Sequence, residues 1–538
     1  MMNMTGMSGF MKHGQIHAPA WAEANIAGVS GLPLGAAMVF CMDSPEGLAP
    51  AKGKPGWVPS LQIPVRPVLS CLPAMFERIF APASIDSLFS DAALLAAMAR
   101  FENGLAHAQA SVGLIPDEAA RAIGVACHEL GDPAASDAPV HDIGGGRFDP
   151  SRLYPAARVA GTLAIPFLKA LSELIDSRTP DATRHLHHGA SHQDLMDSVL
   201  AMQCKEAGRR LQDMLERVGT ALVQLIEDHQ ETMLASRHRL QPDAPIWLAW
   251  KLAGWLDPLQ RSRRHLRAAL LDASVLQFGG PDGTLSSLGT QTERSLSVAQ
   301  RLADALGLML PPASWHVSRD RFVRLGTELA LLCGVLGKIG QDIALMAQAE
   351  IGEVREMPDG RPGPDSVLYQ PQTPVTAQLM MEAAQRAPGL AAVLLGAMDV
   401  QHEGGLSQWQ SGWHTMQQLF GAAASSLAAA EELLGSLQFD GARMQANMAR
   451  QHEQSLPATL VQALTPRLGR EAAQALIAEL HETARENGWS LRQALGRDAR
   501  ISSVMNLGDL ERLFDPAGNP GASGLMVSHI VEAWRSGR

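Results

Sequence analysis

The stretch Arg324–Met346, RLGTELALLCGVLGKIGQDIALM, decides the fold class of this chain. Its large apolar residues follow one another at alternating intervals of four and three. They are Leu325, Leu329, Leu332, Leu336, Ile339, Ile343 and Met346. This spacing is a heptad seam, and it predicts one long helix whose apolar stripe packs against other helices at a shallow angle.

A second seam with the same stagger lies earlier in the chain, within residues 209–230. Its members are Leu211, Leu215, Val218, Leu222 and Leu225. A third helical run, about Ser411–Gly435, is nearly free of charge and rich in small residues, which suits close packing on several sides. Few windows alternate with period two. We therefore predict an all-α chain built around a central bundle of long helices.

The composition points to a large buried surface. Of the 538 residues, 46% are hydrophobic and only 18% are charged, against about 25% charged in an average globular protein. A large core or a large interface between subunits follows. The formal net charge of −11 makes general nucleic-acid binding unlikely as a function class. The apolar piece Gly28–Met42 is too short to span a membrane, so we expect neither nucleic acid nor membrane as a partner.

The cysteines indicate a reducing compartment. The five are Cys41, Cys71, Cys127, Cys204 and Cys333. They are scattered and form no CxxC pair or Cys/His cluster, so neither a disulfide framework nor a zinc site is predicted. We expect a cytoplasmic protein.

Four regions follow from the pattern along the chain. Residues 1–74 are rich in Gly, Pro and Met and have no sustained period, which predicts a dispensable disordered extension or a wrongly chosen start with Met75 as the real one. We expect an N-terminal helical domain over 75–185, a central helix-bundle domain over 186–440 and a C-terminal helical domain over 441–538.

Three short segments carry polar groups that could do chemistry. HLHHGASHQD, residues 185–194, gathers four histidines that could hold a metal or, with the hydroxyl and amide, line a polar pocket for a carboxylate. WHVSRDRF, residues 315–322, offers Arg319 and Arg321 as anion holders, although such pairs are often solvated helix faces. FGGPDG, residues 278–283, lacks the Lys-Ser/Thr of a phosphate loop and predicts a helix-breaking turn.

These segments resemble motifs of a known family. HHGASHQDLMDSVLAMQ resembles the H-x-G-A-T-S-Q-D segment of the fumarase/aspartase superfamily, and in particular its 3-carboxy-cis,cis-muconate cycloisomerase branch. LASRHRLQPDAPIWLAWKLAGWL, residues 234–256, resembles that branch's R-T-x-L-Q-x-A-x-P-x-x-F-G-x-K-x-A-x-W-L. The resemblance extends from about Met75 to near the C-terminus.

The resemblance implies three helical domains and a homotetramer with a twenty-helix core, in which each active site collects segments from three subunits. It implies a small polycarboxylate substrate and no metal or organic cofactor. Members of the superfamily remove a proton next to a substrate carboxylate, or run the reverse addition. The cycloisomerase branch closes a lactone ring on 3-carboxymuconate during protocatechuate breakdown.

The resemblance also implies the site residues. The implied catalytic residues are Ser366, Asp365, His187 and His192. The implied substrate-binding residues are Ser191, Gln193, His238, Arg239, Gln241, Lys251, His316 and Arg319. Among these, His187, Gln241, Lys251, His316 and Arg319 stand where the family pattern has the same residue, whereas His192, His238 and Arg239 are substitutions.

The chain departs from the family in the loop that carries the catalytic serine. In GPDSVLYQPQTPVTAQ, residues 363–378, the base serine corresponds to Asp365 and the next serine to Ser366, while Pro371 and Thr373 replace lysine and asparagine. No lysine follows Lys338. Losing one charge partner of a transition-state anion costs about 2.7–4 kcal/mol. Two interpretations therefore stay open: an enzyme with altered groups, or an inactive homologue that serves as a binding or regulatory subunit.

Overall fold

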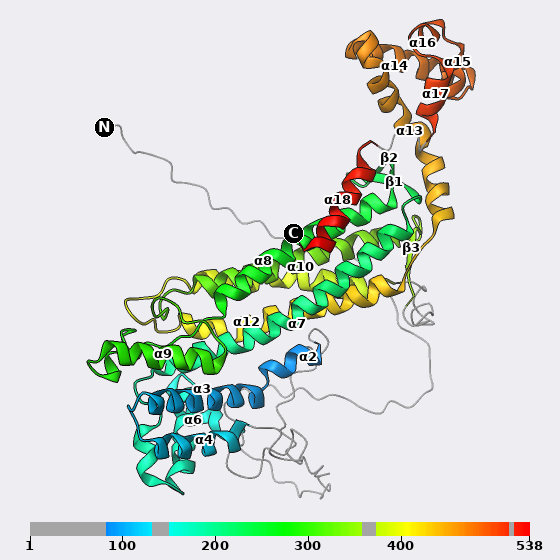
Figure 1. Ribbon diagram of the computed structural model, residues 1–538. Coiled ribbons are helices and arrows are strands. Elements are labelled where there is room, and N and C mark those ends of the chain that lie inside the picture. The colour runs from blue at the N-terminus through cyan, green and yellow to red at the C-terminus, as the bar shows by residue number, and fades with distance from the viewer. Residues whose placement is uncertain (1–81, 132–149, 358–372, 516–520, 538) are drawn as a thin grey trace, which may run out of the picture. The chain divides into compact units, whose positions relative to one another are not determined.

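The computed structural model describes residues 82–131, 150–357, 373–515 and 521–537 (Figure 1). Three features that the sequence predicts lie outside these residues. They are the extension 1–74, the loop that the glycine-rich stretch DIGGGRFDP predicts over 142–150, of which only the last residue is described, and the loop that carries Asp365 and Ser366.

Helices make up most of the described chain. They are α2 (Ala83–Asp86), α3 (Asp91–Ser111), α4 (Asp117–Gly131), α5 (Pro150–Ala160), α6 (Ala164–Asp176), α7 (His192–Asp228), α8 (Leu248–Ala273), α9 (Thr292–Leu306), α10 (Asp320–Met346), α11 (Val375–Gly396), α12 (Gln408–Ser436), α13 (Gly441–Leu468), α14 (Arg470–Asn487), α15 (Leu491–Arg497), α16 (Ala499–Val504), α17 (Leu507–Phe514) and α18 (Ser523–Ser536). Short 3₁₀ turns are η1 (Ser87–Phe89), η3 (Pro180–His185) and η4 (Ser286–Leu288).

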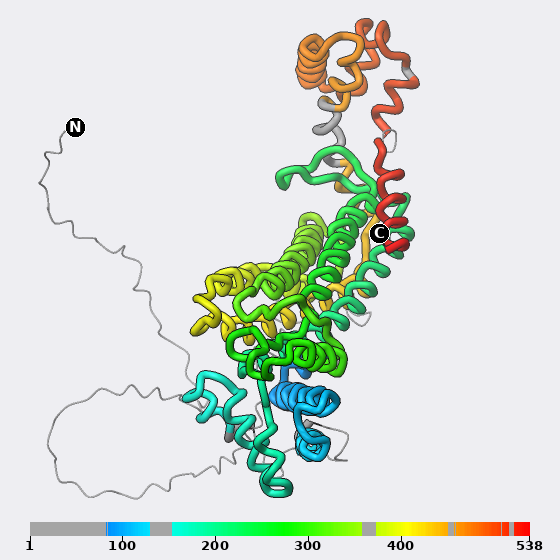
Figure 2. The backbone as a smooth tube through the Cα atoms, turned by 60° about the vertical axis from the view of Figure 1, so that its left-hand side comes forward, coloured from blue at the N-terminus to red at the C-terminus, as the bar shows by residue number. Residues whose placement is uncertain are grey.

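The predicted bundle is confirmed. Its long helices are α7, α8, α10, α11 and α12; α7 packs on α8 and α12, and α10 packs on α8, α11 and α12 (Figure 2). Every member of the Leu325–Met346 seam is buried. In the earlier seam four members are buried, and Leu225 is partly buried against the same core. The heptad spacing therefore identified the faces that form the core.

Strands are few in the described residues, as predicted. β1 (Met233–His238) pairs antiparallel with β2 (Gln241–Trp247), and β3 (Val354–Glu356) pairs antiparallel with β4 (Leu437–Phe439). The β1–β2 hairpin turns at Arg239 and Leu240, whose φ angles are 52° and 64°. Two positive φ angles in a two-residue turn match the twist of an antiparallel hairpin.

The helix α10 is both long and apolar. By length and composition it could cross a membrane, with a mean hydropathy of 1.6 over its most apolar window. However, 56% of that window is buried inside the protein. A helix at the core of a bundle is expected to be long and apolar. The contacts of α10 with three other bundle helices show that it is such a core helix.

The start of α7 is flanked by helices from the first part of the chain. α3 packs on α4, α7 and α9. Arg100 of α3 donates from Nη2 to the carbonyl oxygens of Ala305 and Leu306 at the end of α9, at 3.3 and 3.2 Å. An arginine in this position satisfies carbonyls that have no partner within their own helix.

The last part of the chain has a small core of its own. Leu460, Leu476, Leu480, Leu495 and Leu510 belong to it, from α13, α14, α15 and α17. In contrast, α18 packs against α8 of the bundle. The guanidinium of Arg263 lies 4.0 Å from the ring of Trp534, and a Cβ at Gly219 would overlap that ring. The predicted division at 185/186 and 440/441 stays a prediction.

Candidate functional site

The first turn of α7 is fixed by a capping box. The Ser191 Oγ accepts a hydrogen bond from the Asp194 amide at 3.0 Å, and the Asp194 carboxylate accepts one from the Ser191 amide at 2.8 Å. This exchange satisfies two amides that a helix start otherwise leaves unpaired. Ser191 and its neighbours therefore have a structural task that sequence reasoning did not assign.

The glycine-rich turn at 278–283 holds the same carboxylate. Asp194 is fully buried and accepts hydrogen bonds from the amides of Gly279 at 3.1 Å and Gly280 at 2.8 Å, and from Gln277 Nε2 at 3.0 Å. Burial acts to raise the pKa of Asp194, but the hydrogen bonds from His316, Gln277 and Ser191 outweigh it and lower the pKa. The predicted turn is confirmed, and its amides bind a side chain of the protein.

His316 is locked in place beside Asp194. Its Nε2 lies 3.0 Å from Asp194 Oδ1, and its Nδ1 lies 2.6 Å from Ser314 Oγ. Its backbone oxygen accepts from Gln193 Nε2 at 2.9 Å. The arrangement fits an Nε2–H that donates to Asp194, with the Ser314 hydroxyl donating to Nδ1. The Ser191 hydroxyl lies 3.4 Å from the same Nε2.

Arg319, which we expected to hold a substrate anion, is engaged within the protein. Its Nη1 and Nη2 donate to the two oxygens of Asp197, at 2.7 and 3.0 Å. Both side chains are buried, and Gln193 Nε2 adds a hydrogen bond to Asp197 at 3.1 Å. Arg321 donates to the backbone oxygen of Asp272 at 2.9 Å. A substrate-binding role for Arg319 stays a prediction.

The side chains of His187 and His192 lie next to each other at the start of α7. Their rings stack with centroids 5.8 Å apart. His187 Nδ1 lies 2.7 Å from Glu102 Oε1 on α3, while its Nε2 is buried and has no hydrogen-bond partner.

The two histidines have shifted pKa values of opposite sign. Burial acts to lower the pKa of His187, but the charge and hydrogen bond of Glu102, with Asp194 further away, raise it overall. The pKa of His192 is lowered, chiefly by burial and next by His187, against the pull of Glu102. One histidine is therefore biased toward the protonated form and its neighbour toward the neutral form, which suits acid–base work.

A second group of predicted residues lies at the other end of α7 (Figure 1). His238, Arg239 and Gln241 are exposed at the tip of the β1–β2 hairpin, and Lys251 is in the first turn of α8. The helix α7 has 37 residues, which correspond to a length of about 55 Å. Within one chain, the predicted residues at the start of α7 are therefore far from the hairpin and from Lys251. Lys251 follows the base of the hairpin, so strand β2 separates it from the exposed residues at the tip. Asp365 and Ser366 belong to the loop outside the described residues.

Charged side chains surround this second group. Arg237 forms a bidentate pair with the buried Glu353, at 2.8 and 2.6 Å, and Asn447 Nδ2 donates to Glu353 at 2.9 Å. Burial lowers the pKa of Lys251, against the pull of Asp342. Arg237 is therefore occupied by Glu353, and Lys251 and the exposed Arg239 are the remaining cationic side chains of this group that can hold a carboxylate.

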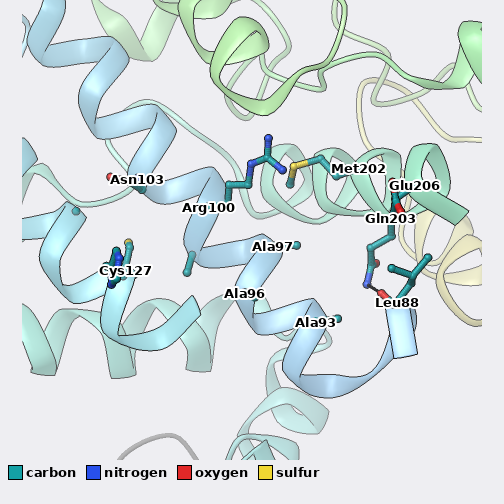
Figure 3. A pocket seen from close by; sticks show the side chains of 13 residues that line it. Leu88, Ala93, Ala96, Ala97, Arg100, Asn103, Cys127, Met202, Gln203 and Glu206 are labelled. Carbon is teal, nitrogen blue, oxygen red and sulfur yellow. Dashed lines mark hydrogen bonds between the residues drawn. The ribbon is translucent and has the colours of Figure 1, made fainter. Parts of the chain in front are cut away.

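A cavity of about 490 Å³ lies between α3, α4 and α7, away from the predicted residues (Figure 3). It is lined by Leu88, Ala93, Ala96, Ala97, Ala99, Arg100, Asn103, Gly124, Cys127, His128, Met202, Gln203 and Glu206. Its wall is mainly small and apolar, and the guanidinium of Arg100 is already bound to the end of α9. Among the residues that the structure describes, none of the predicted catalytic or substrate-binding ones lines it.

Sequence reasoning missed Glu102, Asp197 and Glu353. One signal for Glu102 was available: it lies four residues after Met98 and three before Leu105, on the buried face of α3. A carboxylate within an apolar stripe indicates a buried partner. The identity of that partner, 85 residues further along the chain, could not be read from spacing.

Comparison with known proteins gives a consistent result. A family model described as "Lyase" matches residues 83–389. The chain is 39% identical over 452 residues to 3-carboxy-cis,cis-muconate cycloisomerase of Pseudomonas aeruginosa, covering 84% of this chain and 94% of that protein. It is 31% identical over 462 residues to nitrosuccinate lyase of Streptomyces davaonensis, covering 85% and 94%. The crystal structure of the 3-carboxy-cis,cis-muconate lactonizing enzyme from Pseudomonas putida matches with a TM-score of 0.76 and 34% identity, over 86% of this chain and 99% of that one.

Proposed function

Because this chain belongs to the lyase family whose pattern spans residues 83–389, we propose that it is an enzyme that closes the lactone ring of 3-carboxy-cis,cis-muconate. The identity with the Pseudomonas aeruginosa cycloisomerase, which extends over most of both chains, is the observation that carries this choice of substrate. In protocatechuate breakdown, such an enzyme would act on a small tricarboxylate.

The reaction is an intramolecular addition. One carboxylate oxygen of the substrate bonds to an alkene carbon, and the π electrons move to the neighbouring carbon, next to a second carboxylate. A proton then adds to that carbon. The protein must hold the carboxylates, stabilise the charge that develops on one of them, and supply one proton.

The two groups of residues divide these tasks. His187 and His192 can exchange a proton, and the buried Nε2 of His187 is unpartnered. The substrate carboxylates can be held by Lys251, Arg239 and His238. These side chains would then replace the lysine that the family has in the loop 363–378 and that this chain lacks. The start of α7 is held in place by hydrogen bonds and ion pairs around Asp194 and Asp197. The side chains that take part are Ser191, Gln193, His316 and Arg319.

The two groups can meet only if different copies of the chain contribute them. The five bundle helices of each chain, α7, α8, α10, α11 and α12, would give a twenty-helix core in a homotetramer. Leu271, Leu331, Val393 and Leu395 are large apolar side chains exposed on α8, α10 and α11, which supports an interface there. In this proposal the catalytic site forms at the junction of copies.

The proposal includes a cytoplasmic location and chemistry without a cofactor. The described cysteines, Cys127, Cys204 and Cys333, are buried free thiols, which supports a reducing compartment. The addition needs only charge stabilisation and proton transfer, and side chains can provide both.

The base for the reverse proton removal can be located by two loop substitutions. An aspartate at 365 is a weak base at neutral pH unless burial raises its pKa from about 4. If the loop supplies the base, Asp365→Asn or Ser366→Ala should lower kcat at least about 10²-fold with little change in KM. If both variants keep full activity, the base lies outside the loop, and His187 or His192 is the remaining choice.

The direct test is turnover. Loss of the ultraviolet absorbance of 3-carboxy-cis,cis-muconate should follow addition of the purified protein, whereas fumarate-releasing substrates should be left unchanged. Release of fumarate instead would assign a lyase reaction on a different carboxylate. Relatives of known activity give no support to the inactive alternative, and absence of turnover with every carboxylate would restore it.

A further inference from the structure

Glu102 is a buried carboxyl group with one visible task. Its side chain is 1% exposed, and Oε1 makes its hydrogen bond to His187 Nδ1 at 2.7 Å. Its other oxygen, Oε2, is buried and has no partner. A carboxylate taken out of water in this way is costly unless its partner compensates. The imidazole of His187 is that partner.

His187 is held in an uncommon backbone conformation. Its φ angle is 54°, in the left-handed region that non-glycine residues rarely adopt. Two residues later, Gly189 has φ 75°, and a Cβ there would overlap Leu288. Such conformations persist where the surroundings hold them. Here the turn ends at the Ser191–Asp194 cap, and the Glu102 hydrogen bond fixes the ring on the other side.

The hydrogen bond also determines what the second ring nitrogen can do. With Nδ1–H donated to Glu102, a neutral His187 has its acceptor lone pair on Nε2, and a protonated His187 has a donor there. That Nε2 is buried and has no hydrogen-bond partner within the described residues. The Glu102–His187 pair therefore leaves the Nε2 of the imidazole available to accept a proton from a bound substrate or to donate one to it.

We propose that Glu102 is a positioning residue that holds His187 through Nδ1 and directs its Nε2 at the reacting carbon of the substrate. The chemical part of this inference rests on the proposed function, whereas the pairing of the two side chains does not. Glu102 acts only through His187, so it is not itself a catalytic residue.

The groups that act on His187 come from two helices and the turn before α7. Glu102 faces it from α3, while Asp194 and His192 face it from α7, and the Ser191 backbone adds a hydrogen-bonding contribution. Cys127 of α4 lies near Glu102, and its pKa is raised by burial and by that carboxyl group. Glu102→Gln puts a neutral amide at position 102. It removes the negative charge nearest to His187 and leaves that of Asp194 in place.

The activity arm compares four single variants and one double variant. Glu102→Gln should lower kcat at least about tenfold with little change in KM and move the His187-dependent limb of the pH profile down by about one unit or more. Glu102→Asp should recover part of the loss. Glu118→Gln, the same change at an exposed position of α4, should have no effect. Because Glu102 acts through His187, Glu102→Gln combined with His187→Asn should be no slower than His187→Asn alone.

The stability arm needs no turnover. The pKa of His187 is raised in the folded state. Its pairing with Glu102 therefore stabilises the protein fully at a pH below the pKa of an unfolded histidine, about 6.5. This stabilisation is lost as the pH rises through the pKa that His187 has in the folded protein. Glu102→Gln should therefore lower the melting temperature more at pH 6 than at pH 9, whereas Glu118→Gln should show no such difference.

The two arms separate failure of this inference from failure of the proposed function. If the parent protein turns over no carboxylate, the proposed function fails, and the stability arm still decides whether the pair exists. Equal losses of melting temperature at pH 6 and pH 9 would overturn the pairing. If the parent is active, an unshifted pH profile or additive losses in the double variant would overturn the positioning role.

Discussion

Replacing Arg319 by alanine should lower the free energy of unfolding by about 3–5 kcal/mol, because it leaves Asp197 buried without its counter-charge. The side chains of Arg319 and Asp197 are 4% and 0% exposed, and the pair is bidentate. The guanidinium carbon of Arg319 also lies 5.2 Å from the ring centroid of Trp315 and 5.7 Å from that of Phe322. Denaturant unfolding at one fixed protein concentration measures the loss.

A matched control lies five residues further along the chain. Arg324 of α10 pairs with Asp272 at 3.3 Å, and these two side chains are 63% and 47% exposed. Water and salt screen such a pair, so Arg324→Ala should cost less than about 1 kcal/mol. The double variant Arg319→Met with Asp197→Leu should recover most of the stability, because it removes both buried charges. If Arg319→Ala costs no more than Arg324→Ala, the pair does not have the structural role that its geometry indicates.

Two inactive variants should regain activity when their chains are mixed. His187→Asn damages the group at the start of α7, and Lys251→Ala damages the group about 55 Å away at its other end. If each site takes one group from each of two copies, a random equal mixture restores about one quarter of the sites. Refolding the variants together and assaying turnover measures this recovery.

Two controls make the mixing experiment decisive. Each variant refolded alone should stay inactive, and light scattering should report a tetramer for the parent and for both variants. Mixing that restores no activity, although both variants assemble, would place the two groups in separate functions. A stable monomer at micromolar concentration that still turns over substrate would contradict the shared site outright.

The fold could be predicted because its signal is local and repeated. The seam from Leu325 to Met346 recurs at helical spacing over the whole of α10, and each member is buried. The run of small residues near Ser411–Gly435 falls within α12, where most of it is buried on several sides. Periodicity of this kind needs no knowledge of distant partners.

The site could be predicted only in part, because its geometry depends on partners far apart in the chain. The segment HLHHGASHQD gathers four histidines, and the resemblance implied roles for His187 and His192, yet neither could reveal that Glu102, 85 residues earlier, binds one of them. Arg319 was chosen as an anion holder, and its pairing with Asp197, 122 residues earlier, is invisible in the local pattern. The resemblance placed Lys251 and His187 in one site, whereas a single chain separates them by most of the length of α7.

In the proposed reaction, this chain adds a carboxylate oxygen and a proton across a double bond of 3-carboxy-cis,cis-muconate. Incubating the purified protein with that substrate in D₂O and following the product by proton NMR tests it most directly. We expect a lactone with one deuterium on the carbon next to a carboxylate. It should form in step with the loss of ultraviolet absorbance, and His187→Asn should slow its formation at least about 10²-fold. Substrate that remains unchanged at micromolar protein, or a product without deuterium at that carbon, would contradict it.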